Sequence, residues 1–447
     1  MPVTRHKIRV SQAKVGMFVS ELDRVWRDTP LPAAGFRIAD SADIRRLARW
    51  CNYLYIDAER SDPAVLSMLR APLAFAPPKA PPPRTLADPD GRAHAAFTKT
   101  NEPKPQANIL DLRTGEHRPY RVSTELHEEL PQARAAIGRV VAVADTMVSE
   151  LRWRRGFSLA TLKRALAPLV DSMVRNPDAC IWLSRLKGDK EYLHKHSVAT
   201  AVWAVALGRV LALPEWELHN LALGGLLLDI GKLKLPSALL QKQTPLNRAE
   251  QAHVQAHVQF GLAELRATHG INRQVWDMVA GHHERHNGGG YPRGLRGGAI
   301  PLFARIGAIA DCYDALTSER PYASSVSPLS AQRKMLQGRD SDFQPELIDE
   351  FFESLGTYPA GTLVELSTGE VAVVVAGGGE RKLRPEVLML LDNHKAPIAD
   401  YHSVDLGLVE FSRVGGAMQA LDVIATLPSG SYGLNSAFIQ QAAAHMT

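Results

Sequence analysis

Cysteine is scarce in this chain, and the few that occur stand alone. Cys51, Cys180 and Cys312 are the only three in 447 residues, and none belongs to a C-x-x-C pair. An odd count leaves at least one thiol outside any disulfide, and isolated thiols do not form the knuckles that hold zinc. The composition therefore argues against a disulfide scaffold and against a sulfur-ligated metal site.

Long apolar runs and dense basic blocks are also missing. No run approaches the ~20 apolar residues that a membrane span needs, and the N-terminal stretch MPVTRHKIRV lacks the apolar core of a signal peptide. We therefore expect a cytoplasmic protein without a membrane span. A net charge of +5 is modest for this length, and no Lys/Arg block with interleaved aromatic residues occurs. This disfavours duplex nucleic acid as a partner, whereas a small phosphate-rich ligand suits such a balance.

The length predicts more than one domain. A chain of 447 residues with 45% hydrophobic residues is long for one core. Residues 1–66 are expected to form a small α+β domain. Short β-type runs at 8–10, 17–20 and 35–38 precede a helix that Asp40 or Ser41 can cap, and residues 53–56 return as a strand. Residues 67–118 are rich in proline and alanine and should form an extended linker.

Helical periodicity dominates the next part of the chain. It predicts connecting helices over residues 119–184 and a helical bundle over 185–357, in which residues 191–213 carry one apolar stripe. Residues 221–230 are apolar almost all round and should be central. From residue 358 the pattern alternates and turns at Thr368–Gly369, which predicts a β-rich appendage over 358–447. The expected fold class is mainly α, with a small domain at each end of a helical bundle.

Two local signals place helix starts within the bundle. Asn247 followed by Glu250 predicts a capping box, and the helix behind it would carry His253 and His257 one turn apart on one face. Pro301 suits the first turn of a later helix.

The least accidental stretch is residues 282–292, which read HHERHNGGGYP. Adjacent histidines rarely serve a core, so His282 and His283 suggest a metal that takes both. The glycines at 288–290 let the backbone turn through positive φ and approach a ligand, and the Tyr-Pro that follows stiffens the loop. This pattern predicts the lip of a binding site.

Histidines also cluster along the sequence. Nine of the 16 lie between His194 and His286, a segment that also contains Asp229, and Asp311 follows shortly after. Taken singly, each is better explained as a helix-face histidine or a solvated acid. Taken together, imidazoles that terminate and carboxylates that bridge are what a pair of transition-metal ions requires.

These motifs resemble the signature of the HD-GYP family, bacterial metal-dependent phosphodiesterases that act on cyclic di-GMP. The family pattern is roughly HHExxDGxGYP, with Asn287 here in place of the aspartate. Residues 311–322, DCYDALTSERPY, are close to a second family motif, after which Ala323 replaces a usual basic residue. KVGMFVSELDRVW and NYLYID resemble, more loosely, a small domain often found before such modules. Where the family has His-Asp-Ile-Gly-Lys, residues 228–232 read LDIGK, so Leu228 replaces the HD histidine.

The resemblance implies a set of site residues and a reaction. Two divalent transition-metal ions, Fe or Mn, would be bound by a carboxylate and imidazole set: His196, Asp229, His257, His282, His283 and Asp311. Asp229 and Lys232 would serve catalysis, and the substrate would contact Gly290, Tyr291, Pro292 and Arg320. A metal-bound hydroxide would cleave cyclic di-GMP to pGpG, with GMP as a further product in the family. Diguanylate cyclase domains are partners that the Gly-Tyr-Pro loop could bind.

Leu228 leaves an alternative open. The first metal position would keep His196, Asp229 and Asp311, and losing one imidazole should cost at least the ~10 to 100-fold typical of second-shell changes. The chain is therefore expected to be a cyclic di-GMP phosphodiesterase with weakened activity. The alternative is an inactive HD-GYP module that acts as a cyclic di-GMP receptor or protein adaptor. A mononucleotide hydrolase of HD type is disfavoured, because the Gly-Tyr-Pro loop is peculiar to the cyclic-dinucleotide branch.

Overall fold

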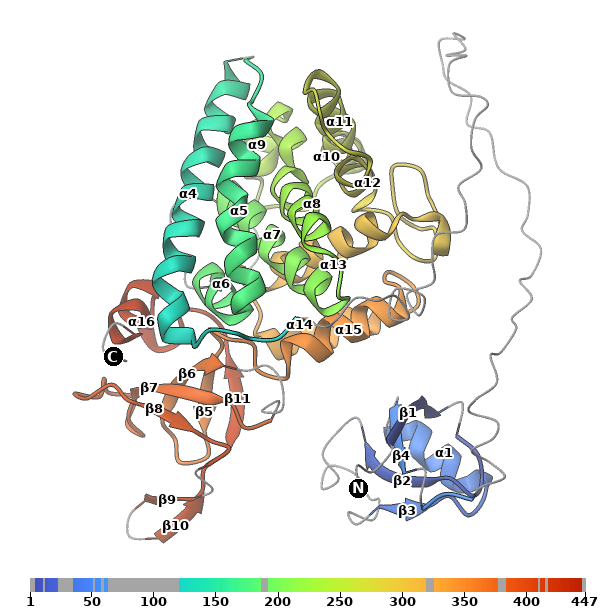
Figure 1. The fold of residues 1–447 in the computed structure, drawn as a ribbon, viewed down its shortest axis with the longest axis vertical. Coiled ribbons are helices and arrows are strands. Elements are labelled where there is room, and N and C mark those ends of the chain that lie inside the picture. Colours follow the sequence, from blue (N-terminus) through green and yellow to red (C-terminus); the bar gives the residue numbers. More distant parts are fainter. Residues whose placement is uncertain are drawn as a thin grey trace. The chain divides into compact units, whose positions relative to one another are not determined.

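The computed structural model describes residues 5–10, 13–22, 35–50, 53–57, 60–62, 120–153, 155–185, 192–318, 325–376, 383–408, 411–414 and 417–443. The chain divides into two compact units, residues 1–98 and 99–447 (Figure 1). The predicted linker, residues 67–118, lies outside the described residues, and the proposed domain boundaries stay predictions.

The N-terminal unit is a small α+β fold. Strands β1 (Arg5–Arg9), β2 (Phe18–Leu22), β3 (Phe36–Arg37) and β4 (Tyr53–Asp57) form an antiparallel sheet in the order β1-β4-β2-β3. The one described helix between the strands is α1 (Ser41–Trp50). The carboxylate of Asp40 accepts hydrogen bonds from the N–H groups of Ala42 and Asp43, which identifies Asp40 as the helix cap. The expected strands and helix are confirmed.

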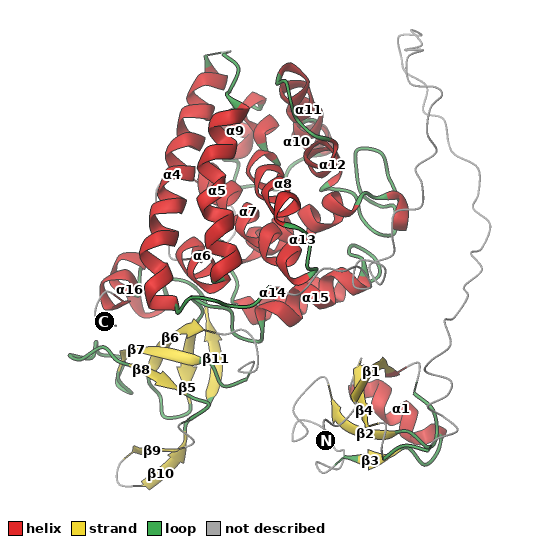
Figure 2. Cartoon of the chain, in the orientation of Figure 1, coloured by secondary structure: helices red, strands yellow, loops and turns green. Residues whose placement is uncertain are grey.

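The second unit is mainly helical (Figure 2). Its helices are α4 (Leu126–Arg152), α5 (Leu159–Arg175), α6 (Pro177–Arg185), α7 (Tyr192–Val210), α8 (Glu215–Leu227), η4 (Ile230–Lys234), α9 (Ser237–Leu240), α10 (Arg248–Gln255), α11 (His257–Ala267), α12 (Arg273–Gly281), η5 (Gly297–Ala299), α13 (Leu302–Thr317), α14 (Pro328–Gln337) and α15 (Pro345–Leu355). No helix in the described part combines the length and apolar character that crossing a bilayer requires.

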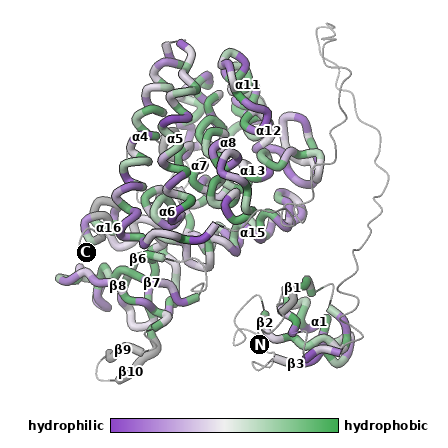
Figure 3. The backbone as a smooth tube through the Cα atoms, viewed as in Figure 1, coloured by the Kyte–Doolittle hydropathy of each residue, from purple (hydrophilic) through white to green (hydrophobic). Residues whose placement is uncertain are grey.

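Helices α7 and α8 occupy the interior of the bundle. Residues 198–208 of α7 are all buried, and so are residues 220–230, which include the end of α8 and the three residues after it, as the apolar composition of 221–230 predicts. The two helices pack closely, since a Cβ added at Gly225 would lie 2.6 Å from the Cα of Ala201. Helix α4 alternates between hydrophilic and hydrophobic stretches, as expected for a helix with one packed face (Figure 3). The packing of α7 against α8 thus places residues 228–230, which follow α8, in the interior of the bundle.

The predicted single helix carrying His253 and His257 is wrong in one respect. The capping box at Asn247 and Glu250 is present, but the helix breaks at Ala256 into α10 and α11. His253 is exposed and His257 is buried, so the two do not share a face. The N–H of Ala256 is shared between the carbonyls of residues 252–254, which ends the regular ladder there. Pro301 lies at the N-cap position of α13, one residue before the helix begins at Leu302, instead of inside its first turn.

The C-terminal part adds a five-stranded antiparallel sheet. Strands β5 (Leu363–Leu366), β6 (Val371–Ala376), β7 (Glu386–Leu391), β8 (Ser403–Asp405) and β11 (Val423–Leu427) are ordered β11-β5-β6-β7-β8. A separate hairpin pairs β9 (Phe411–Val414) with β10 (Ala417–Ala420), and α16 (Ser436–Ala443), which the sequence did not predict, lies near the end. The turn at Gly369, with φ +93°, is where the alternation predicts it. The fold class is confirmed.

One face of this sheet belongs to the helical core. The side chains of Val371, Val373 and Leu388 pack in the same apolar cluster as the helices. The opposite face forms a separate small cluster that includes Val364 and Val374. The appendage is therefore packed on the bundle through alternate residues of its strands.

Candidate metal centre

A single carboxylate joins two groups of potential metal ligands. Asp229 follows α8, lies at the N-cap position of the 3-10 helix η4 and is 2% exposed. One donor atom from each member lies within 4.8 Å of the others in both groups. We call His196, Asp229 and Asp311 the first group. We call Asp229, His257, His282 and His283 the second group.

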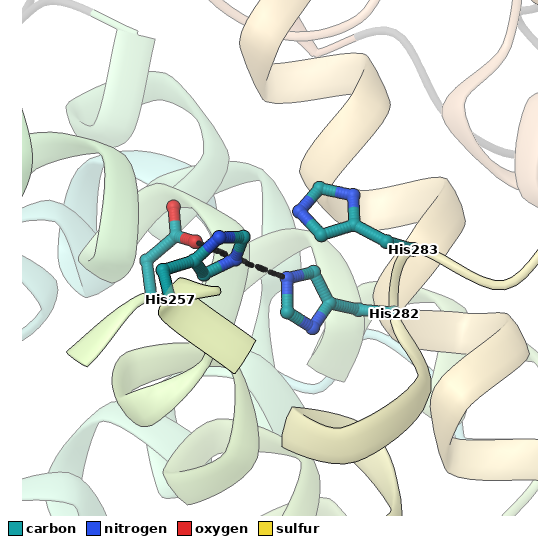
Figure 4. Close-up of side chains that lie close together, drawn as sticks. His257, His282 and His283 are labelled. Carbon is teal, nitrogen blue, oxygen red and sulfur yellow. Dashed lines mark hydrogen bonds and ion pairs between the residues drawn. The ribbon is translucent and has the colours of Figure 1, made fainter. Parts of the chain in front are cut away.

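In the second group, the backbone orients two imidazoles. His257 begins α11 and donates Nδ1–H to the carbonyl of Val254 (2.7 Å), and His282 ends α12 and donates Nδ1–H to the carbonyl of Val279 (3.0 Å). A carbonyl can only accept, so in each neutral ring Nε2 carries the lone pair. These two Nε2 atoms lie 3.4 Å apart, and the ring of His283 lies close to the ring of His282, with centroids 4.1 Å apart (Figure 4).

The electrostatics keep these rings neutral. Burial lowers the pKa of His282 to about 4, and burial likewise lowers the pKa of His257. The pKa of His283 is held well below its ordinary value by burial and by the neighbouring His282. Neutral imidazoles whose lone pairs converge repel one another, and a cation placed between them removes that repulsion. The donor set therefore fits a transition-metal ion.

Asp229 supplies the anionic partner. Its Oδ1 is buried and has no hydrogen-bond donor among the described residues, yet it lies 3.4 Å from Nε2 of His257 and 3.8 Å from Nε2 of His282. Its Oδ2 accepts a hydrogen bond from Nζ of Lys232 at 2.5 Å. Burial alone would raise the pKa of Asp229, but the charge of Lys232 and the hydrogen bond to His196 outweigh it and hold that pKa well below its ordinary value. A buried, ionised carboxylate oxygen without a donor is suited to bind a metal ion.

The first group is built around His196 on α7. Its Nε2 lies 2.9 Å from Oδ1 of Asp311 and 3.5 Å from Oδ2 of Asp229, and its Nδ1 lies 2.6 Å from Oδ2 of Asp314. Burial alone would lower the pKa of His196, but hydrogen bonds to three carboxylates raise it well above its ordinary value. Burial would raise the pKa of Asp311, and His196 reverses that shift and lowers it. One imidazole nitrogen and two carboxylates thus converge here.

Leu228 lies beside this first group. It is 2% exposed, and its Cδ1 lies 3.3 Å from where a Cβ on Gly307 would be. Gly307 precedes Asp311 by one turn of α13, so both positions lie on one face of that helix. The isobutyl group therefore contacts the α13 face that carries Asp311, and it offers no donor atom to the group.

The Gly-Tyr-Pro loop is held in place by Glu284. Its carboxylate is 1% exposed and accepts N–H bonds from Arg293 (2.9 Å) and Leu295 (2.8 Å). The ring of Tyr291 stacks on that of His283, with centroids 4.6 Å apart. The side chain of Asn287 accepts the N–H of Gly289 at 2.7 Å, so the turn-forming bond expected of an aspartate is kept.

The glycines of this loop differ from the expectation. Among residues 288–290 only Gly288 has positive φ, at +83°. Gly290 is required for a different reason, because a Cβ there would lie 2.4 Å from the carbonyl oxygen of His283 and 2.3 Å from the amide nitrogen of Arg285. The loop doubles back on the paired histidines too closely for any side chain.

The structure thus brings together the six predicted ligands and Lys232, and the loop of Gly290, Tyr291 and Pro292 adjoins them. Arg320 and Ala323 lie outside the described residues. Two buried carboxylates at the site, Asp314 and Glu284, were not predicted. Their only signals were an acid one helical turn after Asp311 and an acid directly after the paired histidines.

Comparison with known families defines the class of this fold and site. Residues 183–347 match the HD domain family, and residues 5–161 match a domain of unknown function, DUF3391. The cyclic di-GMP phosphodiesterase PA4108 of Pseudomonas aeruginosa is 32% identical over 409 residues, which cover 90% of this chain and 89% of that protein. The chain therefore belongs to the HD-GYP family of cyclic di-GMP phosphodiesterases.

Other relatives share a smaller part of the chain. The cyclic di-GMP phosphodiesterase response regulator RpfG of Xanthomonas campestris is 35% identical over 163 residues, 36% of this chain and 42% of the relative. The 3'3'-cGAMP-specific phosphodiesterase 1 of Vibrio cholerae is 40% identical over 137 residues, 31% of this chain and 32% of the relative. A solved structure of an HD-GYP-related protein from Bdellovibrio bacteriovorus aligns with a TM-score of 0.43 at 17% identity, covering 78% of this chain and 98% of that one.

Proposed function

We propose that this protein hydrolyses cyclic di-GMP to linear pGpG at the site formed by the two ligand groups. The observation that carries the proposal is the buried Oδ1 of Asp229, which has no hydrogen-bond donor in the described part of the chain and faces the Nε2 atoms of His257 and His282. The 89% coverage of a relative named for cyclic di-GMP supports the choice of substrate.

The two groups would each hold a divalent transition-metal ion, iron or manganese, with Asp229 shared between them. Such ions supply Lewis acidity and bring the pKa of a water molecule towards neutrality. The chain's own part is to arrange the donors: the carbonyls of Val254 and Val279 orient two rings, and Asp314 orients His196. Preorganised ligands need no rearrangement during the reaction.

Lys232 has two roles in this proposal. It donates to Asp229 and so keeps that carboxylate ionised. An ammonium carries three N–H donors, so this bond does not prevent another to a phosphate oxygen as negative charge develops there. The remaining substrate contacts proposed are the loop of Gly290, Tyr291 and Pro292, and Arg320.

The test is hydrolysis by purified full-length protein loaded with Mn(II) or anaerobically with Fe(II). We expect pGpG from cyclic di-GMP, and loss of product in His282→Ala. Because three Vibrio cholerae relatives are named for 3'3'-cGAMP, that dinucleotide is assayed in parallel, and exclusive turnover of it would reject the proposed substrate. Two bound ions with no linear product from either dinucleotide would reject the proposed activity.

Leu228 supports a second candidate, a module that binds cyclic di-GMP, or a diguanylate cyclase domain at the Gly-Tyr-Pro loop, without turnover. Its buried isobutyl group contacts the helix face that bears Asp311, where it adds no ligand. Saturable binding of cyclic di-GMP by the metal-loaded protein, with no product after prolonged incubation, would favour this candidate over the enzyme.

A further inference from the structure

Asp314 is buried next to the first ligand group but belongs to neither group. It lies on α13, one turn after Asp311, and is 3% exposed. Its Oδ2 accepts the Nδ1–H of His196 at 2.6 Å, and its Oδ1 accepts from the indole N–H of Trp203 (3.4 Å) and the hydroxyl of Ser318 (3.3 Å). Two donors from α7 and one from the residue that follows α13 therefore hold both oxygens of this carboxylate in place.

This contact determines which nitrogen of His196 faces the site. In the metal-free protein both ring nitrogens face carboxylates, but only Nε2 is directed towards the potential metal ligands Asp311 and Asp229. A carboxylate accepts and does not donate, so Asp314 would keep the proton on Nδ1 when a metal ion replaces the proton on Nε2. A charged acceptor also makes the far nitrogen of the ring a better metal donor than a neutral carbonyl does. His257 and His282 have only backbone carbonyls in the equivalent place.

The group whose histidine is bound by a carboxylate is also the group that lacks the family's HD histidine. The second group has three imidazoles, whereas the first has His196 alone, with Leu228 at the family's histidine position. The group that is poorer in imidazole is thus the one whose imidazole is bound by a buried carboxylate.

We propose that Asp314 is a positioning residue for the first metal ion: it fixes the tautomer and orientation of His196 and strengthens its Nε2 as a donor, so that this group retains an ion without a ligand at position 228. This inference rests on the proposed function, because Asp314 would raise the metal affinity of the same site. Its test uses metal binding alone and is independent of hydrolysis.

The experiment measures Mn(II) binding to full-length protein, with ions per chain from elemental analysis and affinities from calorimetry. In Asp314→Ala we expect one of the two ions to bind about 10 to 100-fold more weakly, with the other unchanged. Asp314→Asn should recover only part of that loss, since its amide oxygen still accepts from Nδ1–H but the charge is absent. Asp277→Asn is the control, a buried carboxylate on α12 that pairs with Arg273 away from the site.

A purely structural role predicts another pattern, in which unfolding stability falls and both affinities change together. That pattern, or wild-type affinity for every bound ion in Asp314→Ala, overturns the proposal. If Asp314→Ala does not fold, Asp314→Asn decides, and an unchanged Mn(II) affinity in that variant overturns it. A wild-type protein that binds two ions but cleaves no dinucleotide rejects the proposed function and leaves this inference standing.

Discussion

Restoring an imidazole at position 228 is the most direct probe of the first ligand group. Leu228 is 2% exposed, so a histidine there would bury a polar imidazole in place of an apolar side chain. Leaving such a group unsatisfied costs about 1 to 3 kcal/mol, and we expect Leu228→His to be less stable than wild type by that amount without metal.

Metal should reverse this loss. An added imidazole ligand is expected to tighten Mn(II) binding to the first group by at least ~10 to 100-fold, which corresponds to about 1.4 to 2.7 kcal/mol of extra stabilisation at saturating metal. Urea unfolding with and without Mn(II) measures both effects, and turnover of cyclic di-GMP should rise in parallel.

A matched control distinguishes the effect of a new metal ligand from the effect of placing a histidine in the core. Leu227→His introduces the same ring one residue earlier, at a side chain that is 0% exposed, and should lose stability without recovering it on addition of Mn(II). If Leu228→His folds but binds Mn(II) no more tightly than wild type, position 228 is not a ligand position, and Leu228 is not the cause of a weakened first group.

Three further predictions test other parts of the structure. Asp229→Asn should bind neither ion tightly, because both groups use this carboxylate, and elemental analysis that still finds two ions per chain would contradict its shared role. Glu284→Gln leaves without an acceptor one of the two partly buried loop N–H groups that donate to this carboxylate, and it should cost about 1 kcal/mol in urea unfolding, whereas its Mn(II) content should stay at the wild-type level. Burial alone would raise the pKa of Glu129, but hydrogen bonds from Arg175 and Ser172 lower it. Because the pKa of Glu129 is lower in the folded state, the stabilisation that its ionised form gives is present above the ordinary value of 4.5 and is lost as the pH falls through the folded-state value. The difference in unfolding free energy between wild type and Glu129→Gln should therefore be full at pH 7 and shrink below pH 4.5. A difference that does not depend on pH would show that ionisation of Glu129 is not its source.

Much of the fold followed from local pattern, since periodicity and burial are linked within each element. The apolar run at 221–230 is central because no face of it could be left in water, and the alternation around Gly369 requires a hairpin. The break at Ala256 was not predictable in this way, because the capping box behind it and the apolar residues beyond it suit one continuous helix as well as two.

The site could be predicted only where the residue types themselves indicate metal binding. The paired histidines His282 and His283 indicated a metal from the residues alone, whereas Asp229 and the other candidate ligands were assigned through the family resemblance. Asp314 and Glu284 could not be assigned in the same way, because a buried acid is defined by the donors around it, and those donors come from distant positions such as Trp203 and Leu295.

The C-terminal sheet has a consequence for how this protein can be divided. The segment that matches the HD domain family ends at residue 347, but α6 contacts β6, and Gly361 approaches Trp182 so closely that a Cβ there would lie 3.1 Å from its indole ring. A chain cut at the end of that segment would leave the indole and the surrounding aliphatic side chains of the bundle in water, where apolar patches promote association. The smallest piece of this protein that stays monodisperse is therefore expected to extend through the β-strands, well past the last residue that bears on catalysis.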